Sequence, residues 1–352
     1  MTIQELMQLA FSKNASDLHI VAGSPPTLRI HGVLTVVEGF QPLAPEQTSE
    51  YVLGVLNNEQ KEKYLKEKEL DFSIAVPGLG RFRANAYTQR RSMALNLRTI
   101  KEKIPTIEEL RLPKICHTFA NLRQGFILVC GPTGHGKSST LAAIIEEINQ
   151  TRASHIVTIE DPVEFVYKNQ KSIISQRELG WDTLSWGAAL KSALREDPDV
   201  VLVGEMRDPQ TMAAAITVAE TGHLVFATLH TNSAAQTIDR IIDAFPEDQQ
   251  GQVRMQLASS LEAVFSQRLV PAKQGGRVPA AEVLVATPAI RNVIRESKTH
   301  QIDTIIQTSS EMGMMTLETS LAYWVNQGVI DFDQAREFCL RPADLVRLVK
   351  HQ

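Results

Sequence analysis

The chain has 352 residues, a formal net charge of −4 and a hydrophobic content of 43%. This length allows two or three domains with their own cores, and the composition is ordinary for a globular protein. The slightly acidic balance argues against a nucleic-acid-binding protein, because it supplies no global basic field.

Cysteine usage and apolar runs exclude further classes. The three cysteines, Cys116, Cys130 and Cys339, are far apart, so the sequence supports neither a disulfide framework nor a zinc site. No apolar run approaches the ~18 residues of a transmembrane helix, and the N-terminus lacks the features of a signal peptide. We therefore expect a soluble, cytoplasmic protein.

Residues 1–100 are predicted to form a separate α/β domain. Helical spacing of apolar residues covers 2–11 and roughly 46–67. The strand-like runs are 18–21, 27–30, 34–37, 72–76 and 81–87. In the last run, Arg81 and Arg83 share one face of the strand. Two guanidinium groups on a rigid face suit a phosphate, although their spacing alone favours an ordinary charged sheet surface.

The rest of the chain divides into three predicted parts. Residues 101–116 carry two prolines among charged residues and indicate an interdomain linker. Residues 117–286 alternate apolar strands with helices of ten or more residues, the pattern of a parallel sheet covered on both faces. Its expected strands are 126–130, 156–159, 200–203 and 224–228. Residues 287–352 are predicted to be helical, with Thr287 as an N-cap, Pro288 at the first helical position and a further helix at 317–325.

A phosphate-binding loop follows the first strand of the central part. Residues 131–138 fit the pattern G-x-x-x-x-G-K-[ST], with a buried strand before them and a helical pattern after them. Strand, glycine loop and helix bring backbone N–H groups and a helix N-terminus onto an anionic phosphate. Lys137 is expected to reach the β- and γ-phosphates of ATP, and Ser138 to hold Mg²⁺. The predicted nucleotide-binding residues are Gly131, Pro132, Thr133, Gly134, His135, Gly136, Lys137, Ser138 and Ser139.

Acidic residues follow two other strands. One strand runs into Glu160, Asp161 and Glu164, which lie either near the phosphates or in a cap or turn. Glu205 ends a very apolar strand, where a carboxylate holds Mg²⁺, directly or through water, or orients the attacking water. Asp208 is expected to cap the next helix.

Two histidines bracket the strand at residues 224–228. His230 lies at its carboxyl end, where a γ-phosphate can be sensed. His223 lies at the opposite end and is expected to be structural or at a subunit boundary. The functional interpretation of His230 rests on its position, because a single histidine is usually just a satisfied polar group.

Four collinear segments resemble the motifs of the type II/IV secretion ATPase superfamily, and the resemblance covers nearly the whole chain. They correspond to its Walker A motif, Asp box, Walker B motif and His box, at 131–138, 159–164, 203–208 and 221–231. The resemblance implies an α/β architecture with a PAS-like N-terminal domain, a RecA-like P-loop ATPase core and a homohexameric ring. It also implies that Arg81 and Arg83 reach the nucleotide between domains or subunits. His135 stands where that family usually has serine, and an imidazole there can add pH sensitivity.

Residues 289–296 resemble the signature of the superfamily branch that retracts type IV pili, with Val293 in place of leucine. The branch implies an ATP-hydrolysing motor for pilus retraction and twitching motility. It uses ATP and Mg²⁺ and acts at the cytoplasmic face of the inner membrane, which it reaches only through a platform protein. The implied catalytic residues are Lys137, Glu164, Glu205, His230, Arg81 and Arg83.

Within that set, Glu164 is assigned water activation, and Glu205 is assigned Mg²⁺ positioning through water. The two roles remain interchangeable, because sequence does not fix distances.

The same signature segment is predicted to be an amphipathic helix. Its apolar stripe packs the helix onto its own domain; the stripe comprises Ala289, Ile290, Val293 and Ile294. The polar residues Arg291, Asn292, Arg295 and Glu296 are expected to face outward.

Other functions fit the sequence less well than retraction. A paralogous pilus assembly or secretion ATPase usually has a longer N-terminal extension and a four-cysteine zinc site, which this sequence lacks, and an accessory retraction motor is a further paralogue. A RecA-like nucleic-acid translocase is disfavoured by the acidic balance and by 6% aromatic residues. A regulator that binds nucleotide without hydrolysis is disfavoured because Lys137, Glu164 and Glu205 are all present.

Overall fold

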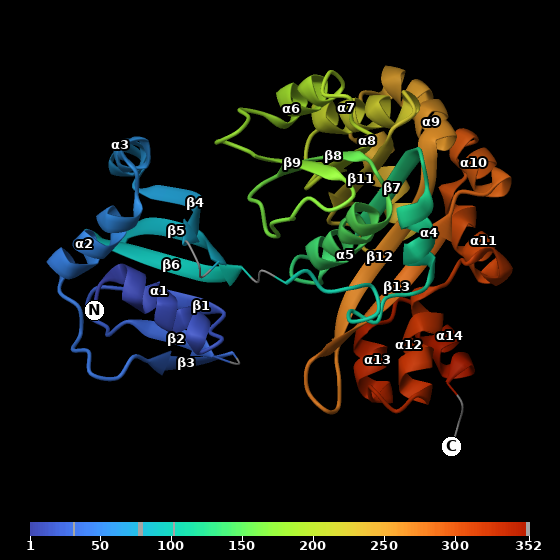
Figure 1. Ribbon diagram of the computed structural model, residues 1–352. Helices are drawn as coiled ribbons and strands as arrows, with labels where there is room; N and C mark the ends of the chain where they lie inside the picture. The colour runs from blue at the N-terminus through green and yellow to red at the C-terminus, as the bar shows by residue number, and fades with distance from the viewer. Residues whose placement is uncertain (31, 77–79, 101–102, 350–352) are drawn as a thin grey trace. The chain divides into compact units, whose positions relative to one another are not determined.

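The computed structural model describes residues 1–30, 32–76, 80–100 and 103–349, which form two compact units (Figure 1). One unit comprises Met1–Lys103 and Pro162–Val166, and the other comprises Ile104–Asp161 and Tyr167–Gln352. Each has a hydrophobic core of its own. Across these described ranges, no helix is both long enough and apolar enough to span a membrane.

The first unit is built on a six-stranded antiparallel sheet of order β3-β2-β1-β6-β5-β4. Its strands are β1 (Asp17–Ile20), β2 (Thr27–Ile30), β3 (Val33–Val36), β4 (Glu69–Val76), β5 (Gly80–Gln89) and β6 (Ser92–Ile100). The sequence does not predict β6, which lies between β1 and β5. Its Met, Ala and Leu residues carry no strong strand signal, and pairing on both sides makes it a strand.

Three helices contribute to the core of this unit. They are α1 (Ile3–Ser12), α2 (Pro45–Val55) and α3 (Asn58–Glu67). The predicted single helical region at 46–67 is therefore two helices. The chain leaves the helical conformation at Leu56, and the Asn57 side chain accepts the Gln60 N–H at 2.8 Å to start α3.

Alternation along β5 separates its two faces as predicted. Phe82 and Ala84 are fully buried in the core that α1, α2 and α3 share with the sheet. Arg81 and Arg83 lie on the opposite face and are half-buried. The pleat thus holds both guanidinium groups on one side of a rigid sheet.

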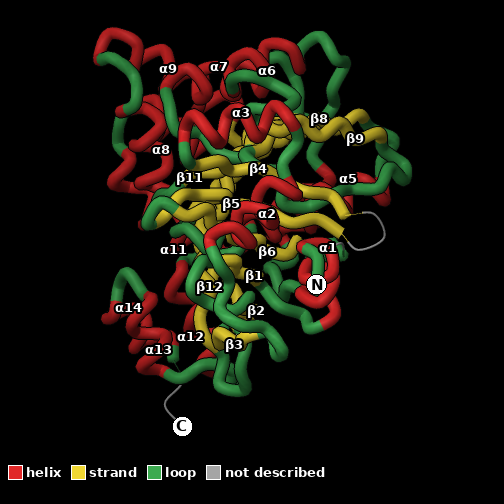
Figure 2. The backbone as a smooth tube through the Cα atoms, turned by 90° about the vertical axis from the view of Figure 1, so that its left-hand side faces the viewer, coloured by secondary structure: helices red, strands yellow, loops and turns green. Residues whose placement is uncertain are grey.

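The second unit contains a seven-stranded sheet of order β13-β12-β7-β11-β10-β8-β9. All neighbouring strands are parallel except the edge pair β12 and β13. The strands are β7 (Gly125–Cys130), β8 (His155–Glu160), β9 (Ile173–Glu178), β10 (Val200–Val203), β11 (Leu224–Leu229), β12 (Leu261–Pro271) and β13 (Arg277–Val285). β8 and β9 run side by side at the edge opposite β13 (Figure 2).

Helices cover both faces of this sheet. One face packs in a single core with α6 (Trp186–Ala193), α7 (Pro209–Glu220), α8 (Ala234–Asp243), α9 (Glu247–Ser260), α10 (Pro288–Arg295) and α11 (Ile302–Thr308). On the other face lie α4 (Ile115–Asn121) and α5 (Lys137–Thr151), with Phe119 edge-on to Phe265 of β12. The prediction that all separating helices have at least ten residues is wrong, because α6 has eight.

The predicted linker also needs correction. Residues 101–102 lie outside the described part of the chain, and the last two linker residues belong to α4. The strands β9, β12 and β13 were not predicted. In particular, β12 follows α9 directly at Leu261, with no glycine or proline to mark the change.

The C-terminal region is helical, as predicted. After α11 come α12 (Leu317–Asn326), α13 (Phe332–Phe338) and α14 (Pro342–Leu348), with short 3₁₀ turns at Thr299–Gln301 and Ser310–Met312. The last three helices form a smaller core with the far ends of β12 and β13, through residues such as Val270, Val278 and Leu321. Thr287 caps α10 and Pro288 takes its first position, which confirms the predicted start.

Candidate active site

The loop between β7 and α5 has the backbone geometry of a phosphate cradle. Gly131, Gly134 and Gly136 have positive φ angles of 142°, 79° and 84°. A Cβ atom at Gly131 would lie 2.2 Å from the carbonyl oxygen of Gln267, so only glycine fits this close approach. The loop leads straight into α5, a helix of 15 residues whose N-terminus favours an anion. These residues fit a nucleotide phosphate.

Lys137 is folded back over this loop. Its Nζ donates to the carbonyl oxygens of Gly131 at 2.7 Å and Pro132 at 3.1 Å, and only 8% of the residue is exposed. Nζ also lies 3.3 Å from Nδ1 of His230. The ammonium group is therefore positioned inside the loop, where a phosphate oxygen would compete for it.

β12 braces the phosphate loop from the side. The Gln267 side chain is 2% exposed; its Nε2 donates to the His135 carbonyl oxygen at 2.8 Å and its Oε1 accepts the Thr140 hydroxyl at 2.6 Å. Both partners belong to the loop and the first turn of α5. No pattern in the sequence indicates Gln267, because β12 itself carries no clear strand signal.

The His135 ring faces β12. Its Nδ1 accepts the Leu269 N–H at 3.0 Å, so this nitrogen carries no proton in the bonded form. Burial lowers the pKa of His135, and the nearby cationic side chains of Arg268, Arg277 and Lys137 lower it further. The imidazole is accordingly neutral near pH 7, and its backbone rather than its ring borders the cradle.

Glu205, directly beyond β10, forms the centre of a charged cluster. Its Oε1 lies 3.0 Å from His230 Nε2 and 2.8 Å from Arg207 Nε, and its Oε2 accepts Arg207 Nη2 at 2.8 Å. Burial alone would raise the pKa of Glu205. The Arg207 hydrogen bonds and the charges of His230, Arg207 and Lys137 outweigh burial and lower this pKa. Glu205 is therefore ionised and firmly held.

Neighbouring strands fix the end of β10. The Gly204 N–H donates to the Ile159 carbonyl at 2.8 Å, and the Thr228 hydroxyl donates to the Gly204 carbonyl. The Met206 N–H in turn donates to Thr228 O at 3.1 Å. The segment that carries Glu205 is thus held between β8 and β11, at the carboxyl edge of the sheet where ligands bind.

A cavity of about 610 Å³ opens beside this cluster. Its walls come from the end of β10, the end of β11 and α8, and they include Glu205, Arg207, His230, Asn232, Gln236 and Arg240. The lining also includes Asp239 and Asp243, so the cavity carries charges of both signs and borders the contact between Glu205 and His230.

The histidines and Asp208 occupy the predicted places. His230 lies among Lys137, Thr133 and Glu205, at the carboxyl end of β11. At the other end, His223 Nδ1 contacts the Val218 carbonyl at 3.1 Å, which is a structural role. Asp208 caps α7 by accepting the Thr211 N–H at 2.8 Å.

Other candidates do not share the compact unit of the phosphate loop. Arg81 and Arg83 belong to the first unit, where Arg81 Nη2 donates to Ser73 Oγ at 2.7 Å. Glu164 is in Pro162–Val166, a segment that also groups with the first unit. Ser138 is exposed in the first turn of α5 and Ser139 is half-buried there.

Glu160 has a local structural role instead. Its Oε1 accepts the hydroxyl of Thr158, in the same strand, at 2.6 Å, and an N–H of Gln176 Nε2 at 3.2 Å, and this second contact links β8 to its neighbour β9. Asp161 is exposed. Of these three acids, Glu164 is the one for which a catalytic role is predicted.

The structure corrects two features predicted for α10. Ile290, Val293 and Ile294 are buried, but Ala289 is exposed and is not part of the packed stripe. Arg291 does not face outward freely: its Nη1 donates to the Ala258 and Ser259 carbonyls, and its Nη2 lies 2.6 Å from Glu262 Oε1. This side chain ties α10 to the end of α9, because those last helical carbonyls need a donor. The remaining three polar residues, Asn292, Arg295 and Glu296, are exposed as predicted.

Comparison with known proteins identifies the family. The model of the type II/IV secretion system protein family matches residues 87–337. The chain belongs to this family. The matched range includes the phosphate loop, the Glu205 cluster and α10, so the family resemblance seen in the sequence is confirmed.

Members of this family are similar to the chain over nearly its whole length. The type IV pilus retraction ATPase PilT of Pseudomonas aeruginosa is 47% identical over 96% of this chain and 98% of its own. A twitching motility protein of Neisseria gonorrhoeae is 46% identical over 95% of this chain and 90% of its own.

A solved structure extends the likeness to the fold. The crystal structure of the pilus retraction motor PilT with bound ADP has a TM-score of 0.93 and 46% identity, and the match covers 99% of both chains. The predicted α/β fold class of this family is confirmed.

Proposed function

We propose that this protein is an ATP-hydrolysing motor that drives type IV pilus retraction, and with it twitching motility, by pilin disassembly. The meeting of Lys137, His230 and Glu205 at the carboxyl edge of a parallel sheet carries the proposal, since it is a constellation for phosphoryl transfer. The near-full-length similarity to a protein named as a retraction ATPase supports the pilus as the load.

The candidate site residues of the second unit each have a role in this proposal. The loop glycines and the N-terminus of α5 bind the phosphates of ATP, and Lys137 stabilises charge on the β- and γ-phosphates. Ser138 and Glu205 would hold Mg²⁺, Glu205 through water. Bound Mg²⁺ would neutralise charge that develops on the transferred phosphoryl group. His230 couples the γ-phosphate to Glu205, because one ring nitrogen contacts Lys137 and the other contacts Glu205.

Glu164 is proposed as the base for the attacking water. Glu205 is a poor base, because Arg207 and His230 bind its carboxylate and its pKa is lowered. Glu164 would accept the water proton while the water oxygen attacks the γ-phosphorus, and the bond to the ADP oxygen breaks to release ADP and phosphate. Glutamine at each position tests this, since Glu164→Gln should lower hydrolysis while sparing ATP binding. Normal hydrolysis by Glu164→Gln and impaired hydrolysis by Glu205→Gln would reverse the two roles.

Arg81 and Arg83 are proposed to complete the site from another part of the assembly. Both lie on one rigid strand face of the first unit, which suits a phosphate. We infer a homohexameric ring in which these arginines act on nucleotide held by the second unit. We also infer that the ring works at the cytoplasmic face of the inner membrane, through a platform protein.

Steady-state phosphate release by the purified full-length protein tests the enzymatic part. Mg²⁺-dependent hydrolysis of ATP is expected, and its absence in the assembled protein would refute the motor. Deletion of the protein tests the direction of the motor: an excess of surface pili that do not retract supports retraction, whereas cells without pili indicate an assembly motor.

A further inference from the structure

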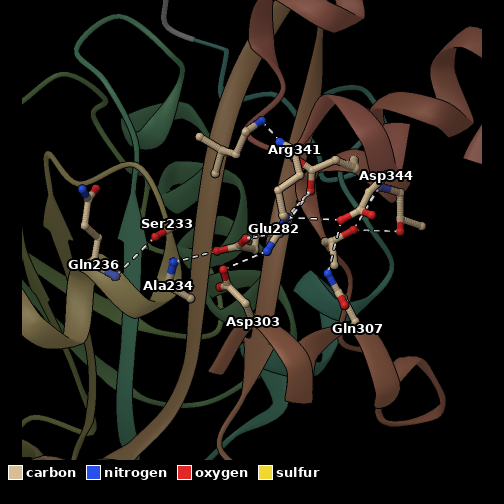
Figure 3. A network of polar contacts seen from close by, with 12 residues as sticks. Ser233, Ala234, Gln236, Glu282, Asp303, Gln307, Arg341 and Asp344 are labelled. Carbon is tan, nitrogen blue, oxygen red and sulfur yellow. Dashed lines mark hydrogen bonds and ion pairs between the residues drawn. The ribbon is translucent and has the colours of Figure 1, made fainter. Parts of the chain in front are cut away.

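A buried carboxylate anchors the loop that follows His230. Glu282 of β13 is 1% exposed, and its Oε1 accepts the backbone N–H of Ala234 at 2.7 Å (Figure 3). Ala234 is the first residue of α8 and follows His230 by four positions, with Ser233 as the helix N-cap. A carboxylate at a helix N-terminus is electrostatically favourable. Glu282 therefore fixes where α8 begins and where the loop from His230 ends.

The other oxygen of Glu282 faces Arg341, the N-cap residue of α14. Oε2 of Glu282 lies 3.6 Å from Nη2 of Arg341. The same guanidinium binds Asp303 of α11 at 2.8 Å (Figure 3). It also binds Glu318 of α12 at 3.1 Å. Arg341 thus joins β13, α11 and α12 at one point.

Glu318 in turn holds Arg341 in place. It is completely buried, and its Oε1 accepts the backbone N–H groups of Leu340 and Arg341, each at 2.9 Å. Any displacement of α12 or of the start of α14 must therefore move the Arg341 guanidinium. The guanidinium is linked to the first turn of α8 through its ion pair with Glu282, whose Oε2 accepts no hydrogen bond from the described residues and whose Oε1 holds the Ala234 N–H.

Glu282 changes its charge near neutral pH. Burial raises its pKa to about 7, and the carboxylates of Asp303 and Glu318 also raise it. The Ala234 N–H and Arg341 oppose this shift. Two further groups sense the Glu282 charge from β12 and β7, namely Arg268 and Cys130.

Stability alone is a weak reason for such a cluster. A buried ion pair often stabilises a fold no more than apolar packing of similar volume. Here one arginine meets four carboxylates, of Glu282, Asp303, Glu318 and Asp344, and the smaller core of α12, α13 and α14 already attaches these helices to β12 and β13. The contact that apolar packing cannot replace is the one from Glu282 to the N–H of Ala234.

We propose that Glu282 and Arg341 are positioning residues for ATP hydrolysis, linking the C-terminal helices to the loop that carries His230. The inference rests on the proposed ATPase activity. In the ionised state, Glu282 holds the start of α8 and keeps the His230 ring between Lys137 and Glu205. The same link lets the C-terminal helices respond to the state of the nucleotide site.

The test compares Glu282→Gln, Arg341→Gln and the control Arg347→Gln in the full-length, assembled protein. Arg347 lies in α14 and its side chain is 81% exposed. Within the described residues, its one ion pair is with Asp344, at 3.9 Å. kcat and KM for ATP are measured from pH 6 to 8. At pH 8 we expect Glu282→Gln to lower kcat about fivefold, with KM changed less than about twofold. Arg347→Gln should match the wild type.

The pH profile separates positioning from a structural role. Glutamine mimics the protonated acid, so the ratio of wild-type to Glu282→Gln kcat should approach one at pH 6 and increase through pH 7. In the Arg341→Gln background, the effect of Glu282→Gln on kcat should depend less on pH. The kcat of the double variant should be little lower than that of either single variant. A ratio that does not change with pH would overturn the proposal.

Melting temperatures exclude simple unfolding as the cause. The folded pKa of Glu282, about 7, lies above its ordinary value of 4.5, so the stability it contributes is present below pH 4.5 and lost as pH rises to 7. The variant Glu282→Gln should therefore melt no lower than the wild type at pH 8. A lower melting temperature with unchanged kcat would overturn the positioning role. No hydrolysis by the wild type would overturn the proposed function and this inference together, whereas hydrolysis unaffected by Glu282→Gln overturns the inference alone.

Discussion

His223 and His230 are chemically the same residue at opposite ends of β11, and only one of them meets the phosphate loop. In a parallel sheet, the carboxyl ends of the strands gather at one edge. His230 therefore lies beside Lys137 and Glu205, while His223 contacts the end of α7. Position in the sheet decides the role of each imidazole.

Lys137 provides the simplest test at the residue scale. Lys137→Ala removes the charge that faces the phosphates, so hydrolysis should fall below detection. Its Nζ donates to carbonyls of the loop itself and lies beside His230, at the edge of the sheet and outside the hydrophobic core, so the melting temperature should change by less than about 5 °C. Lys191→Ala, at an exposed position of α6, is the control. Hydrolysis at the wild-type rate by Lys137→Ala would disprove the assignment of the phosphate loop.

Gln267 should affect binding of ATP more than folding of the domain. Gln267→Leu removes the bonds to His135 and Thr140, and each is worth about 0.5–1.5 kcal/mol. We expect the Kd for ATP to increase roughly tenfold, as measured by isothermal titration. Gln252→Leu, at an exposed position of α9, is the control. Unchanged affinity would mean that the loop holds its shape without β12.

His135 should make the fold sensitive to acid. Its folded pKa is below the ordinary value of 6.5, so the unfolded chain binds the proton more readily and stability falls as pH drops below about 6.5. Protonation also breaks the bond from the Leu269 N–H. Between pH 7.5 and pH 5.5, the melting temperature of His135→Asn should therefore decrease less than that of the wild type. Parallel losses in both proteins would contradict this role.

At the scale of elements, local sequence predicted the parts that carry a local signal. The run before Gly131 and the i, i+3, i+4, i+7 spacing after it predict β7 and α5, and the structure confirms both. The apolar strands β8, β10 and β11 were found for the same reason. The phosphate loop joins β7 to α5, Glu205 follows β10 and His230 follows β11, so these predicted elements position most of the candidate site.

The elements that were missed depend on distant pairing. β12 and β13 combine polar residues, alanines and a proline, and each becomes a strand by pairing with its neighbour in the sheet. Gln267 and Glu282 lie on these two strands, so their contacts with the loop and with α8 could not be foreseen. Arg291 was misjudged for a related reason, because its partners are carbonyls at the end of another helix.

α10 offers a test that separates structure from force transmission. Arg295 is exposed, so Arg295→Ala should leave ATP hydrolysis and stability unchanged but impair twitching, in keeping with the retraction signature. Arg291→Ala should instead lower stability by about 1–3 kcal/mol, because it leaves the Ala258 and Ser259 carbonyls without their donor. Lys191→Ala, at an exposed position of α6 outside the signature, is the control. Normal twitching with Arg295→Ala would leave the exposed face of α10 without a role in retraction.

At the scale of the whole molecule, the candidate site divides between the two compact units. The phosphate loop, Glu205 and His230 belong to one unit, and Arg81, Arg83 and Glu164 belong to the other. The roles proposed for Arg81, Arg83 and Glu164 therefore predict that hydrolysis requires both units, from one subunit or from two.

Mixing two inactive chains tests this division. Arg81→Ala/Arg83→Ala keeps an intact phosphate loop, and Lys137→Ala keeps intact arginines. If the arginines act between subunits, mixed rings should regain part of the activity at interfaces that combine the intact halves. Each variant alone at the same total concentration is the control. Full activity in a verified monomer would contradict a shared site.

Retraction is measured most directly by imaging labelled type IV pili on living cells of the bacterium that encodes this protein. Cells without the protein should extend pili that do not retract, and the wild-type gene should restore retraction. The gene for Lys137→Ala should not restore it, because the motor then lacks ATP hydrolysis. Retraction restored by Lys137→Ala, or the absence of pili from cells without the protein, would contradict an ATP-driven retraction motor.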